Sequence, residues 1–300
     1  MDPTREGAGA EADLLVTCWG TRGSICVPGP DTVRFGGNTS CVAVESGDGL
    51  LVLDAGTGIR ALGRHLASGP GSAPVDVDLF VTHFHWDHIQ GLPFFEPLYH
   101  PTTTVRVHGP AENSGELRRL VLGTMESVHF PLSPTALAAR MEFVPLGSGP
   151  WRKGELEVAW IPLRHPQGAV GYRVRRGGVV GVAYLPDNEL EGGEYGLGEG
   201  WYESVVDFVA GANVLFHDAM YTDGEYETRV GWGHSTYRQA ARLAEEAGVT
   251  ALRFFHHAPG RTDAELAELA ETAREERAGR EPPLDVDAAA EGQAMRLPGP

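Results

Sequence analysis

The chain has 300 residues, of which 42% are hydrophobic and 22% are charged, a composition typical of a globular protein with a substantial core. Its formal net charge of −17 disfavours binding along the length of a nucleic acid, because an acidic surface repels polyanions. No run reaches the 18 apolar residues of a membrane span, and residues 1–13 lack the apolar core of a signal peptide. We therefore expect a cytoplasmic protein, with Cys18, Cys26 and Cys41 reduced because no Cys-x-x-Cys spacing relates them.

The first half of the chain is read as paired strands followed by alternating strands and helices. Apolar runs and alternating patterns, bounded by Gly and Pro, identify the strands. Amphipathic spacing identifies the helices. We predict strands at 14–20, 41–45, 50–54, 75–82, 104–108, 141–144 and 156–161, and helices at 59–67, 112–126 and 135–140.

The second half repeats this arrangement, beginning with a hairpin through Arg-Arg-Gly-Gly. We predict strands at 170–174, 179–184, 214–217, 250–255 and within 288–297, and helices at 202–210, 237–247 and 263–277, the last capped by Asp263. Two sheets packed together with helices outside fit this order. We expect a flexible N-terminus over 1–13 and a single domain over 14–297.

A cluster of potential metal ligands lies directly after the strand at 75–82. His83, His85, Asp87 and His88 place four such side chains within six residues. In extended backbone, residues two apart point the same way, so His83 and His85 can share one ion. Asp87 and His88, beyond the strand, can face a second ion. A single His-x-His can arise by chance, but four ligands together with Gly91 favour a metal site.

Further ionisable residues follow other predicted strands. Each has a structural alternative, since a lone histidine can be a core residue and an aspartate can form a turn. A carboxylate after a buried strand is costly unless it is capped or bound to metal. Together they indicate an active site at the strand ends: Asp54, His165, Asp187, His217, Asp218, His234, His256 and His257.

The order of these motifs resembles the metallo-β-lactamase superfamily, and more narrowly the branch of ribonuclease Z and the bacterial phosphodiesterases of phosphonate metabolism. The resemblance covers about residues 14–297. It implies an α/β fold, a four-layer αββα sandwich of two mixed β-sheets. It is carried by His83-x-His85-x-Asp87-His88, Gly20-Thr-Arg-Gly, Leu53-Asp54-Ala-Gly-Thr-Gly, His165 with Gly171-Tyr-Arg, Tyr184-Leu-Pro-Asp187, Phe216-His-Asp218-Ala and Gly233-His234-Ser-Thr.

The resemblance implies two divalent metal ions, expected to be zinc, with manganese or iron as alternatives. It assigns one ion to His83, His85 and His165, the other to Asp87, His88 and His256, with Asp187 bridging. His256 is preferred to His257 because the family's ligand directly follows its strand. Asp54 is expected to orient a ligand histidine.

The resemblance also implies an acid for the reaction. His234 resembles the catalytic histidine of ribonuclease Z, and Asp218 stands where that family has a glutamate, which reaches one methylene farther. We therefore expect Asp87, His234 and Asp218 to be catalytic. Two ions of this kind lower the pKa of a bridging water, and the hydroxide attacks phosphorus. A protonated His234 can stabilise the developing charge or protonate the leaving alkoxide.

The substrate prediction depends on a missing segment. Ribonuclease Z carries a long arm for tRNA between two ligands, whereas Asp187 here follows His165 by only 22 positions. With the acidic charge, this favours small or cyclic phosphodiesters, with tRNA 3′-end processing as the alternative. Thioester or lactam hydrolysis is a further alternative, although the zinc-binding cysteine of common lactamases is absent. A homodimer is possible. We consider Arg22, Arg164 and Arg173 as phosphate contacts, although structural roles are favoured for each.

Overall fold

A computed structural model describes residues 14–68, 75–126, 128 and 130–299, so the predicted flexible segment 1–13 lies outside the described residues. The first of two sheets has the order β14-β1-β2-β3-β4-β5-β6. Strands β1 to β3 and β14 pair antiparallel, whereas β3 to β6 pair parallel. The strands are β1 (Leu14–Gly20), β2 (Cys41–Ser46), β3 (Gly49–Leu53), β4 (Asp76–Phe80), β5 (Thr104–Gly109), β6 (Arg140–Pro145) and β14 (Ala294–Leu297).

The second sheet is also mixed and has the order β13-β12-β11-β10-β9-β8-β7. Strands β7 to β10 pair antiparallel and β10 to β13 pair parallel. The strands are β7 (Trp151–Lys153), β8 (Leu156–Leu163), β9 (Ala169–Arg176), β10 (Val179–Leu185), β11 (Val214–Asp218), β12 (Ala251–Phe255) and β13 (Asp285–Ala288).

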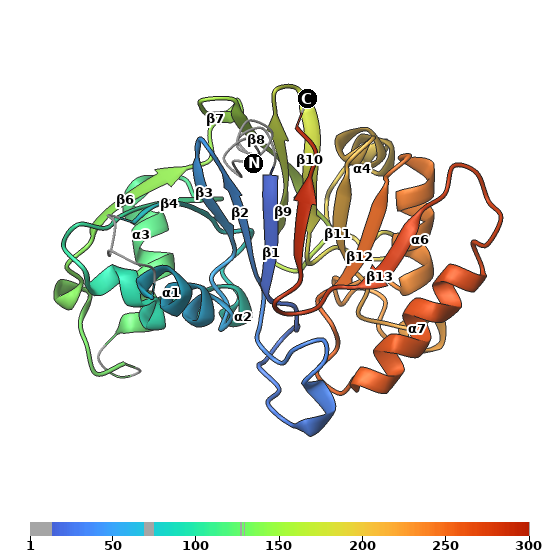
Figure 1. Ribbon diagram of the computed structural model, residues 1–300, viewed down its shortest axis with the longest axis horizontal. Helices are drawn as coiled ribbons and strands as arrows, with labels where there is room; N and C mark the ends of the chain where they lie inside the picture. Colours follow the sequence, from blue (N-terminus) through green and yellow to red (C-terminus); the bar gives the residue numbers. More distant parts are fainter. Residues whose placement is uncertain (1–13, 69–74, 127, 129, 300) are drawn as a thin grey trace, which may run out of the picture.

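Helices cover the outer face of each sheet (Figure 1). Helices α6 and α7 begin at capping boxes, in which Thr236 and Thr262 exchange hydrogen bonds with Gln239 and Glu265. Within the described ranges, no helix is long and apolar enough to cross a membrane. The helices are α1 (Ile59–Ala67), α2 (Trp86–Ile89), α3 (Ser114–Leu122), α4 (Trp201–Val209), α5 (Asp223–Tyr226), α6 (Tyr237–Glu246) and α7 (Asp263–Glu275).

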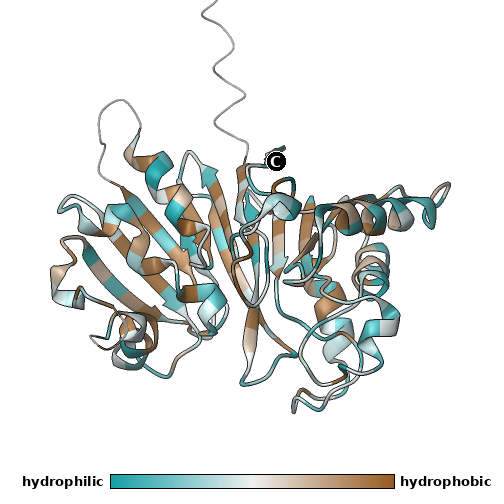
Figure 2. Cartoon of the chain, turned by 90° about the horizontal axis from the view of Figure 1, so that it is seen from below, coloured by the Kyte–Doolittle hydropathy of each residue, from teal (hydrophilic) through white to brown (hydrophobic). Residues whose placement is uncertain are grey.

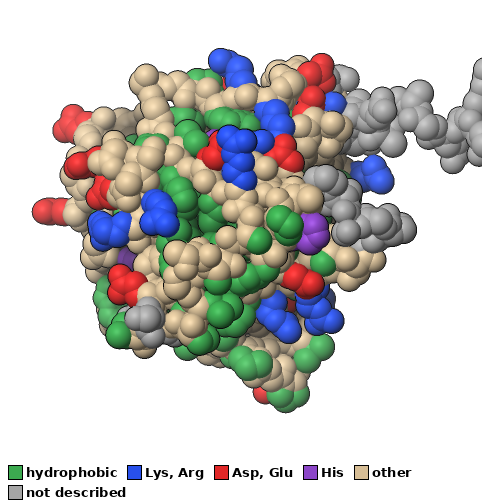
Figure 3. Space-filling model, turned by 90° about the vertical axis from the view of Figure 1, so that its left-hand side faces the viewer, with side chains coloured by type: hydrophobic (Ala, Val, Ile, Leu, Met, Phe, Trp, Pro, Cys, Tyr) green, Lys and Arg blue, Asp and Glu red, His purple; other side chains and the backbone are tan. Residues whose placement is uncertain are grey.

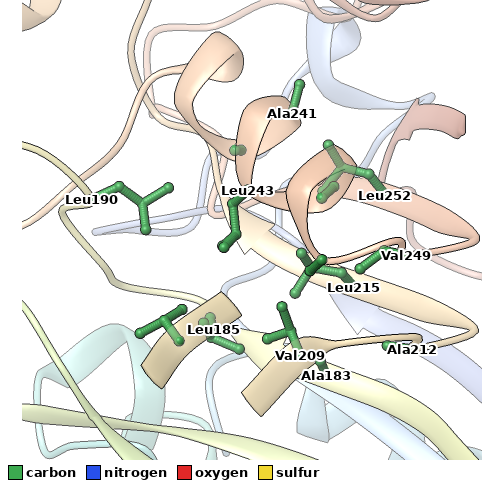
Figure 4. Packing of buried hydrophobic residues seen from close by; sticks show 14 of the residues in the cluster. Ala183, Leu185, Leu190, Val209, Ala212, Leu215, Ala241, Leu243, Val249 and Leu252 are labelled. Atoms are coloured by element: carbon green, nitrogen blue, oxygen red, sulfur yellow. The ribbon is translucent and has the colours of Figure 1, made fainter. Parts of the chain in front are cut away.

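Three apolar clusters hold these layers together. The middle cluster joins the facing sides of the sheets, with Val16 and Leu53 from the first and Tyr172 and Val182 from the second. A second cluster packs α1 and α3 on the first sheet. The third packs α4 and α6 on the second sheet, and Figure 4 shows leucines of β10, β11 and β12 beside α6. Figure 2 shows the corresponding concentration of apolar residues on the strands. The predicted four-layer αββα sandwich is confirmed.

Two local predictions were wrong and a third was incomplete. Residues 135–140 do not form a helix, because a 3-10 turn at Pro134–Ala136 ends in extended backbone and β6 begins at Arg140. Helix α7 is capped by Thr262, whereas Asp263 accepts hydrogen bonds from the backbone of Arg34 and Phe35. The last strand predicted within 288–297 is present as β14 (Ala294–Leu297), whereas β13 (Asp285–Ala288), which belongs to the other sheet, was not predicted.

A buried carboxylate connects an inner strand of the first sheet to an edge strand of the second. Asp78 on β4 is 1% exposed and lies 3.1 Å from Lys153 Nζ on β7, 3.3 Å from Arg106 and 3.1 Å from His108 on β5. Burial raises the pKa of Asp78, but hydrogen bonds from His108 and Lys153 and the nearby Arg106 lower it more, so it lies below its usual range.

Replacing Asp78 by Asn should lower the free energy of unfolding at pH 7 by about 2 kcal/mol, because charge-assisted hydrogen bonds are lost inside the protein. Since the folded pKa is below the unfolded one, this contribution is complete above about pH 4 and disappears as the pH falls through the folded value. Urea unfolding measures it. Asp76→Asn is the control: Asp76 contacts the same Arg106 and Lys153 but is half exposed, so its loss should cost about 0.5 kcal/mol or less. Equal losses would contradict the account.

Candidate metal centre

The candidate ligands converge where strands of both sheets end. His83 and His85 lie between β4 and α2, and α2 carries Asp87 and His88. Figure 1 shows α2 close to the lower ends of the strands. The second sheet contributes His165 after β8, Asp187 after β10, Asp218 at the end of β11 and His256 directly after β12. His234 precedes α6.

Several overlapping groups of three side chains have donor atoms within 4.8 Å of one another. One group is His83, His85 and His165, and another is Asp87, His88 and His256. His234 belongs to two further groups, one with His165 and Asp187 and one with Asp218 and His256. His165 Nε2 is 3.1 Å from His85 Nδ1, and His256 Nε2 is 3.1 Å from Asp87 Oδ2.

Asp187 lies between the first two of these groups. One carboxylate oxygen is 3.5 Å from His165 Nε2 and 3.3 Å from His256 Nε2. The other oxygen is 3.0 Å from His88 Nε2. The structure therefore brings together all seven residues expected to bind metal.

Asp54, at the end of β3, fixes the orientation of this cluster. Its buried carboxylate accepts hydrogen bonds from the Thr82 backbone N–H (2.8 Å), His88 Nδ1 (2.8 Å) and the Tyr184 hydroxyl (2.9 Å). The Thr82 hydroxyl also contacts Asp54 and lies 3.1 Å from His83 Nδ1. Because the Nδ1 atoms of His83 and His88 are engaged in this way, their Nε2 atoms are the ones available to a metal.

Two site residues adopt a backbone conformation that L-residues seldom adopt. Asp54 has φ of 61° and His256 has φ of 57°, each directly after a buried strand. Left-handed backbone costs roughly 1 kcal/mol at a non-glycine residue and is found where the surrounding structure enforces it. At both positions it turns a polar side chain back toward the strand ends.

Two glycines allow the chain to pass close to the ligands. A Cβ atom at Gly233, where φ is +86°, would lie 2.4 Å from the His165 ring. A Cβ at Gly23 would lie 2.4 Å from the His256 ring. The Gly233 carbonyl also contacts His165 Nδ1 at 3.0 Å. A side chain at either position would displace a ligand histidine.

The pKa values follow from burial and from the carboxylates. Burial lowers the pKa of His83, and that of His165 to about 4, so both imidazoles are neutral donors at pH 7. Burial raises the pKa of Asp187, but the surrounding histidines, His256 first, lower it well below its usual range. Burial lowers the pKa of His88, but Asp187, Asp87 and Asp54 together raise it well above its usual value. The negative charges of these neighbouring carboxylates are therefore stabilised by positive charge placed between them.

Buried polar atoms that lack a hydrogen bond indicate that bound metal ions could supply this positive charge. Nε2 of His83, Nε2 of His88 and Oδ1 of Asp187 are buried and form no well-aligned hydrogen bond among the described residues, although His88 Nε2 and Asp187 Oδ1 lie 3.0 Å apart. Buried polar atoms seldom remain unpaired in folded proteins. Imidazole nitrogens and carboxylate oxygens are the donors that zinc, manganese and iron accept. The site therefore fits two neighbouring divalent ions.

His234 and Asp218 form a hydrogen-bonded pair beside this cluster. His234 Nδ1 lies 2.6 Å from Asp218 Oδ2, so the aspartate reaches the histidine despite being one methylene shorter than glutamate. Asp218 Oδ1 also accepts from the backbone N–H groups of Met220 and Ser235. The His234 ring stacks on His256 with centroids 5.0 Å apart, which places the pair next to the ligands.

Glu189, which the sequence reading did not single out, holds the loop before His234. Its side chain is fully buried and accepts hydrogen bonds from the backbone N–H groups of Gly231 (2.8 Å) and Gly233 (2.9 Å). The hydroxyls of Tyr195 and Tyr226 also donate to it. Its position two residues after Asp187 is the only sequence signal that could have indicated this role.

The remaining candidates have structural partners. His257 Nε2 donates to the Ala289 carbonyl at 2.8 Å. Arg22 is buried and donates to the carbonyls of Gly36, Ala258 and Arg261. Arg164 stacks on Trp201, and Arg173 stacks on Phe208. None of these arginines lines the cavity over the ligands. That cavity has a volume of about 520 Å³ and is lined by Ser24, Phe84, His85, Trp86, Asp87, His165, Pro166, Asp187, Trp232, His234 and His256.

Comparison with known proteins identifies a family and individual proteins that are similar to this chain. A family model described as "Beta-lactamase superfamily domain" matches residues 50–257, which include all of the ligand groups described above. The ribonuclease Z of Haloarcula marismortui is 27% identical over 303 residues, covering 87% of this chain and 91% of that protein.

Solved structures share the fold across nearly the whole chain. A diphosphatase from the PhnP family superposes with a TM-score of 0.65 at 18% identity, covering 96% of this chain and 100% of the other. The short form of human tRNase Z gives a TM-score of 0.63 at 20% identity, covering 95% and 99% of the two chains. At these identities the likeness shows a common fold.

Proposed function

The chain belongs to the metallo-β-lactamase superfamily and is a metal-dependent hydrolase of its ribonuclease Z-like branch, and we propose that it cleaves phosphodiester bonds. The observation that carries this proposal is the His234–Asp218 pair, 2.6 Å apart beside a cluster that fits two metal ions. Cleavage of a diester with an alkoxide leaving group is accelerated by neutralisation of phosphate charge and by protonation of the alkoxide, and this arrangement offers both.

We propose that His83, His85 and His165 hold one ion, and that Asp87, His88 and His256 hold the other, with Asp187 between them. Zinc is the metal we propose, with manganese or iron as alternatives. When bound, such a pair of ions supplies an activated water and neutralises charge on the phosphate. Asp87 is kept in place by the Ser24 backbone N–H, which donates to it at 2.7 Å.

His234 is the proposed general acid. Because Nδ1 is engaged by Asp218, Nε2 is the nitrogen that can hold a proton toward the leaving oxygen. Burial lowers the pKa of His234, which makes the imidazolium a stronger acid but reduces its protonated fraction at neutral pH. Burial raises the pKa of Asp218 well above its usual value, so these two groups are suited to share a proton.

Two substrate classes remain, and a different observation favours each. The relatives named ribonuclease Z, together with the tRNase Z fold, favour processing of tRNA 3′ ends. Small or cyclic diesters are favoured by the short β9–β10 hairpin between His165 and Asp187 and by the charge of −17. The PhnP-family diphosphatase also fits the second class.

Purified protein loaded separately with zinc and with manganese should cleave bis(p-nitrophenyl) phosphate, and removal of metal with a chelator should abolish the activity. Comparison of kcat/KM for cyclic nucleotides and for a 3′-extended tRNA precursor separates the substrate classes. A loaded protein that opens a thioester or a lactam but cleaves no phosphodiester would overturn the proposal.

Replacement of His234 by Ala should lower kcat by about 100-fold or more on a diester with an alkoxide leaving group, such as a cyclic nucleotide, because general acid catalysis contributes factors of this size. The effect on bis(p-nitrophenyl) phosphate should be much smaller, because p-nitrophenolate leaves without protonation. Bound metal, measured by atomic emission, should remain at the wild-type amount. His257→Ala is a matched control, since His257 contacts the Ala289 carbonyl outside the cluster, and it should keep both metal and turnover if it folds. Loss of metal from the His234 variant would identify His234 as a ligand instead.

A further inference from the structure

An apolar groove opens beside the cavity that contains the proposed ligands. It has a volume of about 640 Å³, and we define the apolar groove by Phe84, Trp86, Ile89, Phe94, Leu120 and Phe130. Phe84 and Trp86 line both the groove and the ligand cavity. The two spaces therefore adjoin at these two side chains.

The local sequence explains why these two aromatic residues line both spaces. Phe84 lies between His83 and His85, and Trp86 lies between His85 and Asp87. Polar and aromatic residues thus alternate along the segment that enters α2. A substrate bound at the ligands lies directly beside these two aromatic rings.

The aromatic side chains of the groove are unusually exposed. Trp86 is 72% exposed and Phe94 is 55% exposed. The Phe94 ring contacts Phe130 edge-on, with centroids 5.5 Å apart. Figure 3 views the side of the molecule that carries α1 and α3, where apolar side chains gather in a band. Contiguous apolar surface of this kind is typical of a binding site, whereas single exposed apolar residues are ordinary.

The charge of the groove restricts its occupant. Among the described residues that line it, Glu126 is the only charged side chain, and no lysine or arginine is present. A continuing phosphate backbone would therefore meet an acidic, uncompensated surface. A second space of about 450 Å³ adjoins the ligand cavity at Trp232 and His234, and it is lined by Arg229 and Arg261 together with Glu225 and Glu265. The groove is therefore mainly apolar, whereas the second space contains charged side chains of both signs.

We propose that the apolar groove binds one substituent of the phosphodiester, and that this substituent is an uncharged aromatic or alkyl group. The inference rests on the proposed function, because it assumes a diester at the ligands. Phe94 then determines specificity: it touches the substituent and not the reacting phosphate. The second space, with its arginines and glutamates and its Arg261–Glu225 ion pair, is available to the other, more polar substituent.

Competitive inhibition by symmetric diesters tests the proposal, because either substituent can enter the groove. Against bis(p-nitrophenyl) phosphate turnover, the inhibition constant should fall about tenfold or more from dimethyl to diphenyl phosphate, as expected when an aryl group leaves water. In Phe94→Ala, the inhibition constant should fall less than threefold from dimethyl to diphenyl phosphate. In Phe94→Leu, part of the tenfold difference should return. Val33→Ala is the control, since Val33 is 78% exposed outside the groove, and it should keep the full fall.

Equal inhibition constants for dimethyl and diphenyl phosphate, or a full tenfold fall in Phe94→Ala, would overturn the proposal. Sedimentation provides a second arm: a wild-type dimer that becomes monomeric in Phe94→Ala would place another copy of the chain in the groove, which also overturns it. Calorimetric titration with the same diesters measures groove binding even if no phosphodiester is cleaved. Failure of the proposed function is thereby distinguished from failure of the groove assignment.

Discussion

The buried carboxylate of Asp54 is the interaction on which the rest of the site depends. It lies at the end of a first-sheet strand, accepts a hydrogen bond from Tyr184 of the second sheet and holds Nδ1 of His88. Through Thr82 it also reaches His83. A hydrogen bond between the two sheets thus also helps to orient the histidines. This explains why the left-handed backbone of Asp54 is tolerated.

The second constraint is the concentration of buried charge. Asp54, Asp87 and Asp187 lie together with little or no contact with water, an arrangement that is unfavourable unless positive charge compensates it. Donor atoms of His83, His88 and Asp187 that form no well-aligned hydrogen bond belong to one group within 4.8 Å of one another. A site of two divalent ions resolves both problems, since it neutralises the carboxylates and engages the unpaired donors. Function and stability of this region are therefore coupled.

Much of the fold was predictable because its strands are strongly apolar and its helices amphipathic. Residues 135–140 were wrongly predicted to be helical because they have high helix propensity and follow Pro134. Their conformation is determined instead by the tertiary pairing of β6 with β5. The ligand residues could be found because they occur in recognisable order at strand ends. Glu189 could not, because its partners Gly231 and Gly233 are reached only when a distant loop folds back. The apolar groove likewise depends on aromatic residues from separate segments.

The central claim is that this cluster holds two metal ions between the sheets. Anomalous diffraction from crystals of the zinc-loaded protein, recorded on both sides of the zinc absorption edge, tests it most directly. The account predicts two peaks, one contacted by His83, His85 and His165 and the other by Asp87, His88 and His256, with Asp187 touching both. No peak at this position in fully loaded protein, or a single peak that leaves either group of residues without metal, would contradict the account.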